Sequence, residues 1–183
     1  MERLTRSESS EHSEGAPTWL PDGKSIVFAN IVCESPADSI CRVHRVDLET
    51  RRTIDIPGSD GLRTARVSPD GRFLAAQRES TGQILLYSFG TGRWSELATR
   101  VSGDDLAWTR DSGSIFGYTR WAEEPVLLRI SVRDHRVTRV TSLSGLIDSA
   151  GSSRYWMGLD DQDRPLLFHS FSAVEVYSAE INQ

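Results

Sequence analysis

The sequence predicts an all-β fold, specifically a β-propeller of about four four-stranded blades. Three segments share one pattern, an apolar run, a tight turn containing Asp and Gly, and a second apolar run; they are Trp19–Phe28, Val67–Ala75 and Trp108–Phe116. In the first two the turn is Pro-Asp-Gly, in which Pro fixes φ near −65° and Gly takes the left-handed conformation that closes a hairpin. Asp22, Asp70 and Asp111 lie 48 and 41 residues apart. A repeat of that length holds about four short strands with their turns, the size of a propeller blade.

The first predicted blade covers about residues 16–57, after a polar tract at 7–15 that we expect to be a solvent loop. Its strands are expected at 18–20, 25–30, 40–48 and 53–56. Cys33 and Cys41, the only two cysteines, flank the loop between the second and third of these strands. Either they are two small buried thiols or they form a disulfide across the hairpin, and no further ligand stands at a zinc spacing.

The second predicted blade, about residues 62–99, is the clearest copy. Its strands are expected at 62–68, 73–77, 83–88 and 94–98. Every break between them carries a glycine that a tight turn can use, among them Gly71, Gly82 and Gly92. Trp94 is expected to pack between blades.

The third predicted blade covers about residues 105–141. Its strands are expected at 106–109, 114–119, 126–131 and 137–140. The turn from Arg110 to Gly113 is expected to be one residue longer than Pro-Asp-Gly. Trp121, preceded by Arg120, falls on a connecting loop, where it either anchors a partner protein or packs on a neighbouring blade.

The fourth predicted blade, about residues 154–183, has three strands, expected at 155–159, 165–169 and 174–179. The turn from Asp160 to Asp163 replaces Pro-Asp-Gly, and we expect a polar turn because it lacks the Gly and the distal Glu of a calcium loop. Residues 2–6 are the candidate for a closing strand that completes this blade. All four blades would form a single domain over residues 1–183.

These hairpins resemble the TolB-like, Pro-Asp-type propeller repeats, relatives of the WD repeats, whose signature is Trp-Ser-Pro-Asp-Gly-Lys/Arg followed by a strand. The resemblance implies that Trp19, Trp108 and Trp156 pack in the core near the inner strand. The stretch 156–177 resembles the closing segment of propellers found behind winged-helix regulators of acidobacterial type.

What the resemblance implies about function is a non-catalytic binding module, the sensor or scaffold part of a larger bacterial regulator. The alternative is a gating domain of a prolyl-oligopeptidase-like peptidase whose catalytic domain is absent from this sequence. Because propellers of this family usually have six to eight blades, we expect a partial arc or half-ring, with a closed four-blade ring as the alternative. Uncovered blade faces would expose apolar surface and favour self-association through the open blade edges.

Composition and motifs limit the other function classes. The net charge is −5 with scattered charges, so this chain itself is not expected to bind nucleic acid. No apolar run approaches the roughly 18 residues of a membrane helix, and the compartment, cytoplasm or periplasm, stays open. The four histidines are dispersed, and no Gly-x-Ser-x-Gly elbow or Gly-x-Gly-x-x-Gly loop occurs. We therefore expect no catalytic, cofactor or metal site, no enzyme activity, and a protein or small-molecule partner that the sequence does not name.

Overall fold

The computed structural model of the chain describes residues 4–5, 14–30, 41–78, 80–98, 101, 105–119, 124–144 and 157–167, and every structural statement below concerns these residues. They form fourteen strands. Within these ranges no residue is helical, as the all-β prediction requires. In the same ranges, no helix has the length and apolar character needed to span a bilayer.

The strands form successive antiparallel meanders, which we call blades 1 to 4. Blade 1 is β1 (Glu14–Trp19), β2 (Ser25–Asn30), β3 (Val43–Asp47) and β4 (Thr53–Asp55). Blade 2 is β5 (Leu62–Val67), β6 (Phe73–Arg78), β7 (Ile84–Ser88) and β8 (Arg93–Ala98). Blade 3 is β9 (Ala107–Trp108), β10 (Ser114–Tyr118), β11 (Val126–Ser131) and β12 (Val137–Ser142). The described part of blade 4 is β13 (Met157–Leu159) and β14 (Pro165–Leu167).

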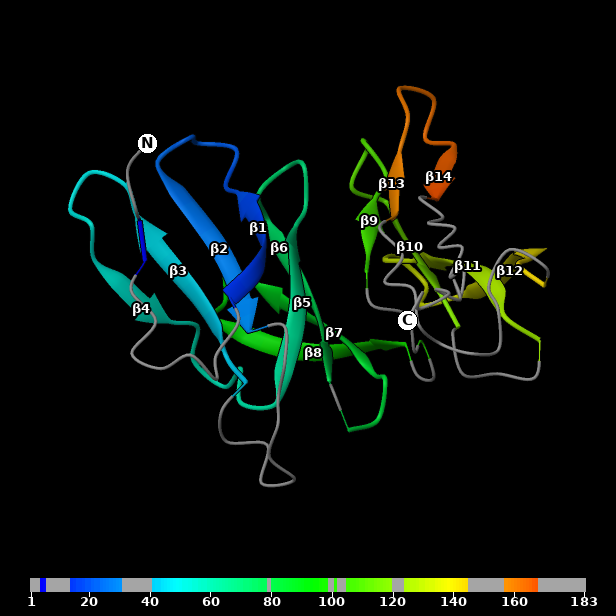
Figure 1. Ribbon diagram of the computed structural model, residues 1–183, viewed down its shortest axis with the longest axis horizontal. Coiled ribbons are helices and arrows are strands. Elements are labelled where there is room, and N and C mark those ends of the chain that lie inside the picture. Colours follow the sequence, from blue (N-terminus) through cyan, green and yellow to red (C-terminus); the bar gives the residue numbers. More distant parts are fainter. Residues whose placement is uncertain are drawn as a thin grey trace, which may run out of the picture.

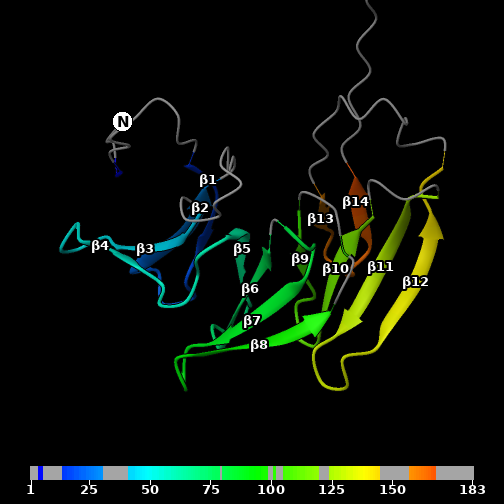
Figure 2. The ribbon, with the colours of Figure 1, turned by 90° about the horizontal axis from the view of Figure 1, so that it is seen from below.

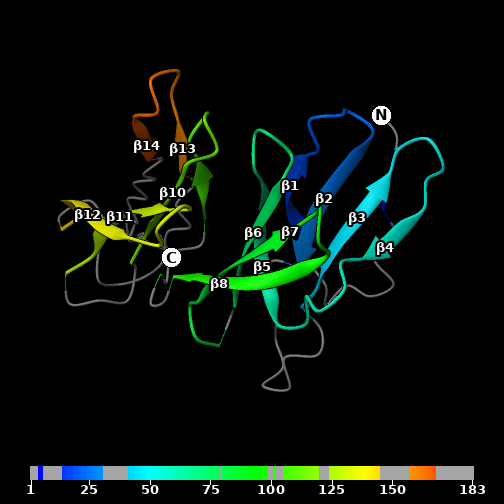
Figure 3. The same cartoon turned by 180° about the vertical axis from the view of Figure 1, so that it is seen from behind.

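The blades fan out around a common centre, as in a propeller. In Figure 2 the first strands β1, β5, β9 and β13 lie nearest this centre, and β4, β8 and β12 lie at the periphery. Figures 1 and 3 show blades 1 and 2 on one side and blades 3 and 4 on the other. Among the described residues, each sheet contains the strands of one blade, and no strand of blade 1 joins blade 4, as fits a propeller arc.

The hydrophobic core lies between the blades. One cluster joins blades 1 and 2, a second joins blades 2 and 3, and a third joins blades 3 and 4. The second strand of each complete blade is therefore apolar on both faces: on β10, Ile115 belongs to the cluster shared with blade 2 and Phe116 to the cluster shared with blade 4. The fourth strand β12, by contrast, is exposed along its whole length. Burying one such core side chain contributes about 1.5–3 kcal/mol, so the inner strands hold the arc together.

The turn between the first two strands has one feature in common in all four blades. One residue of each turn has a left-handed φ, and these residues are Gly23 (67°), Gly71 (70°), Ser112 (59°) and Asp163 (58°). Each donates its backbone N–H to the carbonyl three residues earlier, at 2.8–3.1 Å.

The expectation of a longer turn in blade 3 is wrong. Thr109 N donates to Ser114 O across five residues, just as Ser68 N donates to Phe73 O in blade 2. Ser112 takes the left-handed position, and Gly113 only follows it. The turn that does differ is in blade 4, where Asp160 N donates to Arg164 O and one residue is missing.

A hydroxyl group reinforces the turns of blades 2 and 3. Ser68 Oγ donates to Asp70 Oδ1 at 2.6 Å and accepts from Phe73 N at 3.0 Å. Thr109 Oγ1 likewise donates to Asp111 Oδ1 at 2.6 Å and accepts from Ser114 N at 2.9 Å. The bond from Thr109 is the main cause of the lowered pKa of Asp111.

Two predicted segments lie mainly outside the described residues. Of the candidate closing strand at 2–6 only Leu4 and Thr5 are described, and they are not part of a strand. The expected third strand of blade 4, residues 174–179, is not described at all. How blade 4 is completed therefore stays a prediction.

Candidate functional site: an arginine-lined pocket on blade 3

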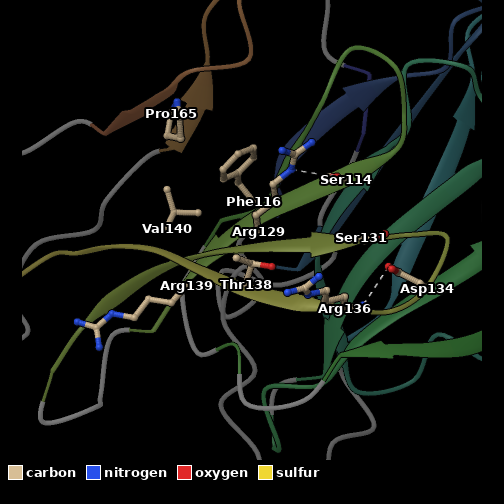
Figure 4. Close-up of a pocket in the computed structure, with 10 residues that line it drawn as sticks. All are labelled: Ser114, Phe116, Arg129, Ser131, Asp134, Arg136, Thr138, Arg139, Val140 and Pro165. Atoms are coloured by element: carbon tan, nitrogen blue, oxygen red, sulfur yellow. Dashed lines mark hydrogen bonds between the residues drawn. The ribbon is translucent and has the colours of Figure 1, made fainter.

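A pocket of about 560 Å³ opens on the face of blade 3 that is directed toward blade 4. Figure 4 shows its lining, which comes from β10, β11, β12 and the β11–β12 turn, with one residue from β14. The lining residues are Ser114, Phe116, Arg129, Ser131, Asp134, Arg136, Thr138, Arg139, Val140 and Pro165.

Strand pleating brings the central side chains of the pocket onto one face. Ser114 and Phe116 are two residues apart on β10, and they pair across the sheet with Ser131 and Arg129 of β11. Residues two apart share a face, and directly opposed residues are neighbours on it. This is the face away from Ile115, which packs toward blade 2.

Arg129 is held in place by two contacts. Its Nε donates to Ser114 Oγ at 3.1 Å, and its guanidinium carbon lies 5.9 Å from the ring centroid of Phe116, a cation–π distance. The side chain is nevertheless exposed. Since a guanidinium has five N–H donors, the bond to Ser114 uses only one of them.

The other charges of the pocket come from the outer strand and its turn. Asp134 Oδ1 accepts from Arg136 N at 3.3 Å, and a hydrogen bond with the side chain of Ser131 is the main cause of the lowered pKa of Asp134. Arg139 forms an ion pair with Glu124 at the edge of the sheet, and this bond lowers the pKa of Glu124. Because Arg139 is paired with Glu124, the remaining charges of the lining are those of Arg129, Arg136 and Asp134, and they leave the pocket with a net positive charge.

Blade 1 carries the same arrangement in a smaller form. Arg45, at the position of Arg129, donates from Nη2 to Ser25 Oγ at 2.9 Å and lines a pocket of about 220 Å³. In blade 1, Asp47 occupies the position that Ser131 has in blade 3. Asp55 on β4 occupies the position that Arg139 has on β12. The Arg–Ser bond thus occurs in blades 1 and 3 but not in blade 2, where Leu86 stands at the position of Arg129, and the larger pocket volume belongs to blade 3.

The structure places few of the sequence-predicted site residues. Arg120 and Trp121 lie outside the described residues, so a partner contact there stays a prediction. Cys41 is fully buried and not a free thiol, but Cys33 is outside the described ranges, so their disulfide also stays a prediction.

Asp160 behaves as expected of a polar turn. Its Oδ1 accepts from the backbone of Gln162 and of Arg164, and its Oδ2 accepts from Arg164 Nε. The backbone bond from Arg164 is the main cause of the lowered pKa of Asp160. Across the ranges that the structure describes, no group of three or more His, Cys, Asp or Glu side chains is arranged to hold a metal ion.

The tryptophans divide into buried and exposed copies. Trp108 is buried, and Trp94 packs between blades 1 and 2 and donates from Nε1 to Pro57 O at 2.8 Å, both as predicted. The prediction that Trp19 is a core residue is wrong: it is 59% exposed, because no described blade precedes blade 1. Trp156 lies outside the described residues.

The sequence prediction missed the arginine pocket. Its one visible signal was Arg129, a charge on the same strand face as Leu127 in an otherwise apolar run. Arg45 occupies the same position in blade 1 and is half-buried, whereas Arg129 is exposed. An arginine at this position therefore does not by itself predict whether a neighbouring blade covers it.

No protein-family model and no curated protein sequence matches the chain. Solved structures do match. TolB from Acinetobacter baumannii has 25% identity and a TM-score of 0.54 over 70% of this chain and 32% of that one. The putative TolB from Agrobacterium tumefaciens has 13% identity and a TM-score of 0.58 over 74% and 51%.

The chain has the fold of a TolB-like β-propeller. The propeller domain of the Trilobed protease from Pyrococcus furiosus, described as having an open velcro topology, matches with 14% identity and a TM-score of 0.53 over 73% of this chain and 43% of that one. An acylaminoacyl peptidase from Pyrococcus horikoshii matches with 14% identity and a TM-score of 0.54 over 72% and 25%. This TolB-like arc thus spans about a third to a half of the matched TolB chains.

Proposed function

We propose that this chain is a non-catalytic binding module that holds an acidic segment of a partner protein in the blade 3 pocket. In this proposal the arc is the sensor or scaffold part of a larger bacterial regulator. The observation that carries the proposal is that Arg129 and Arg136 line one pocket on an exposed blade face.

The chemistry of the pocket suits carboxylates. Guanidinium groups bind carboxylates through paired, charge-assisted hydrogen bonds. Ser131 and Thr138 add hydroxyl groups, and Phe116 supplies an apolar floor for the methylene groups of a glutamate. A volume of about 560 Å³ falls in the range of ordinary ligand pockets and has room for more than one side chain.

The test is calorimetric titration of the chain with a hexaglutamate peptide at low salt. Arg129→Gln with Arg136→Gln is expected to weaken binding about tenfold or more, since each charge-assisted bond contributes about 1.5–3 kcal/mol. The matched control is Arg45→Gln with Arg52→Gln, the same two positions in blade 1. Equal weakening by both pairs, or no binding by the unmodified chain, would contradict the proposal.

The peptidase-gating alternative is supported by the matches to the Trilobed protease and to acylaminoacyl peptidase, which concern the fold alone. The two functions differ in what flanks the propeller in the full gene. An encoded winged helix supports the regulator proposal, and an encoded α/β-hydrolase domain supports the gating one.

A further inference from the structure

The residue just before the turn packs each blade onto the blade before it. Val67 of blade 2 shares a core cluster with Val27 of blade 1, and Trp108 of blade 3 shares one with Ala75 of blade 2. Leu159 of blade 4 packs against the cluster that contains Phe116 of blade 3. Trp108 also donates from Nε1 to Arg66 O of β5 at 2.9 Å, a bond between inner strands.

Blade 1 presents the same position without a partner blade. Trp19 is 59% exposed, whereas Trp108 is 9% exposed. The turn beside it is also uncovered: a Cβ on Gly71 would lie 3.1 Å from Pro21 of the preceding blade, but a Cβ on Gly23 would meet nothing within 4 Å.

Blade 4 presents the other half of such a junction. Leu166 pairs with Gly158 across the sheet, as Phe116 pairs with Ala107 and Ala75 with Arg66. Leu166 therefore stands at the position that receives the next blade. It is 48% exposed, while Ala75 and Phe116 at this position are buried.

We propose that two copies of the chain join head to tail, with blade 1 of each against blade 4 of the other, and close a ring. Trp19 of one copy then packs on Leu166 of the other and donates Nε1 to the Gly158 carbonyl, which corresponds to the Arg66 carbonyl that accepts from Trp108. The contact repeats the three blade junctions described above, so the chain carries both complementary halves itself. The charges of the two surfaces are also complementary. Lys24, next to Gly23 in one copy, would meet the exposed Asp161 in the blade 4 turn of the other copy.

Such a contact joins two different surfaces, so its geometry decides between a closed ring and an open filament. Size-exclusion chromatography with light scattering measures the outcome. The expected mass is that of two chains of 20.4 kDa. Trp19→Glu and Leu166→Glu are each expected to weaken association at least about 30-fold, the effect of a hot-spot aromatic or its pocket. The control Val137→Glu changes an apolar side chain of similar exposure, 44%, away from the junction and should remain paired.

Mixing Trp19→Glu with Leu166→Glu provides a second measurement, which does not rely on the behaviour of either variant alone. Each keeps the half that the other lacks, so an equimolar mixture is expected to regain one junction and sediment as a pair. A single-chain mass for the unmodified protein, a filament in place of a pair, equal dissociation by Val137→Glu, or no recovery on mixing would each overturn the proposal.

Discussion

Asp105 connects three blades through one carboxylate. Its Oδ1 accepts from Arg66 Nη2 of blade 2 at 2.5 Å and from Leu106 N of its own blade at 2.9 Å, and its Oδ2 accepts from Met157 N of blade 4 at 3.3 Å. Burial raises the pKa of Asp105, and the Arg66 charge offsets this only in part. Protonation of this group is therefore favoured by folding.

This raised pKa predicts how stability depends on pH. A carboxyl whose pKa is higher in the folded chain contributes stability that is lost as pH rises above its ordinary value of 3.8. Since Asp105→Asn does not titrate, the stability advantage of the unmodified chain over this variant should narrow as the pH rises above 3.8. Urea denaturation followed by tryptophan fluorescence measures the difference, and Glu49→Gln in an exposed turn is the control. A gap that widens with pH would contradict the expectation.

Individual residues also mark the limit of sequence prediction. Pro21-Asp22-Gly23 and Pro69-Asp70-Gly71 predicted their turns correctly because only the left-handed residue is demanding, and glycine occupies it. Ser112 and Asp163 take the same conformation without glycine, so the position of Gly113 predicts the wrong turn length in blade 3. The environment of Trp19 and Arg129 depends on which blade covers them, and no local pattern reports that.

At the scale of elements, neighbouring turns contact one another around the centre of the arc. Asp70 N donates to Ser112 Oγ at 3.1 Å, linking the turns of blades 2 and 3, and Arg110 N donates to Asp163 Oδ1 at 3.0 Å, linking those of blades 3 and 4. Between blades 1 and 2 the contact is the Pro21 ring against Gly71. Gly71 has no side-chain oxygen that could accept a bond as Ser112 and Asp163 do, so close packing takes the place of a hydrogen bond here.

Gly71→Ala and Gly23→Ala form a matched pair that isolates this packing. Both place a Cβ at a left-handed residue, which costs roughly 1–2 kcal/mol. Only Gly71→Ala also displaces the Pro21 ring, so it should lower the free energy of unfolding by about 1 kcal/mol more. The free energy of unfolding of both variants is measured by urea denaturation in a Leu166→Glu background. This substitution prevents the proposed pairing of two chains, which would otherwise cover Gly23. Equal losses would mean that the Pro21 contact has no energetic role.

Strand boundaries followed less closely from the sequence than turns did. β1 begins at Glu14, inside the polar tract 7–15 that predicts a solvent loop, because the backbone of Glu14 pairs with Asn30. Ladder pairing needs only main-chain groups, which apolar periodicity does not detect.

For the whole molecule, the position of the core between blades predicts a gradient of local stability. Amides of β6 and β10, whose central residues are buried on both faces, should exchange slowest with deuterium. Amides of β4 and β12, exposed along their length at the periphery, should exchange fastest. Hydrogen exchange with mass spectrometry measures this order, and protection of β12 equal to that of β10 would contradict it.

The bond from Trp108 to the Arg66 carbonyl has a consequence for how such chains diversify. The acceptor is a main-chain group, so it persists whatever side chain occupies position 66, and the indole places no demand on the identity of its neighbour. A blade added by gene duplication would therefore find the same main-chain acceptor in its neighbour. Arcs of this type can gain or lose whole blades while the remaining blade junctions stay intact.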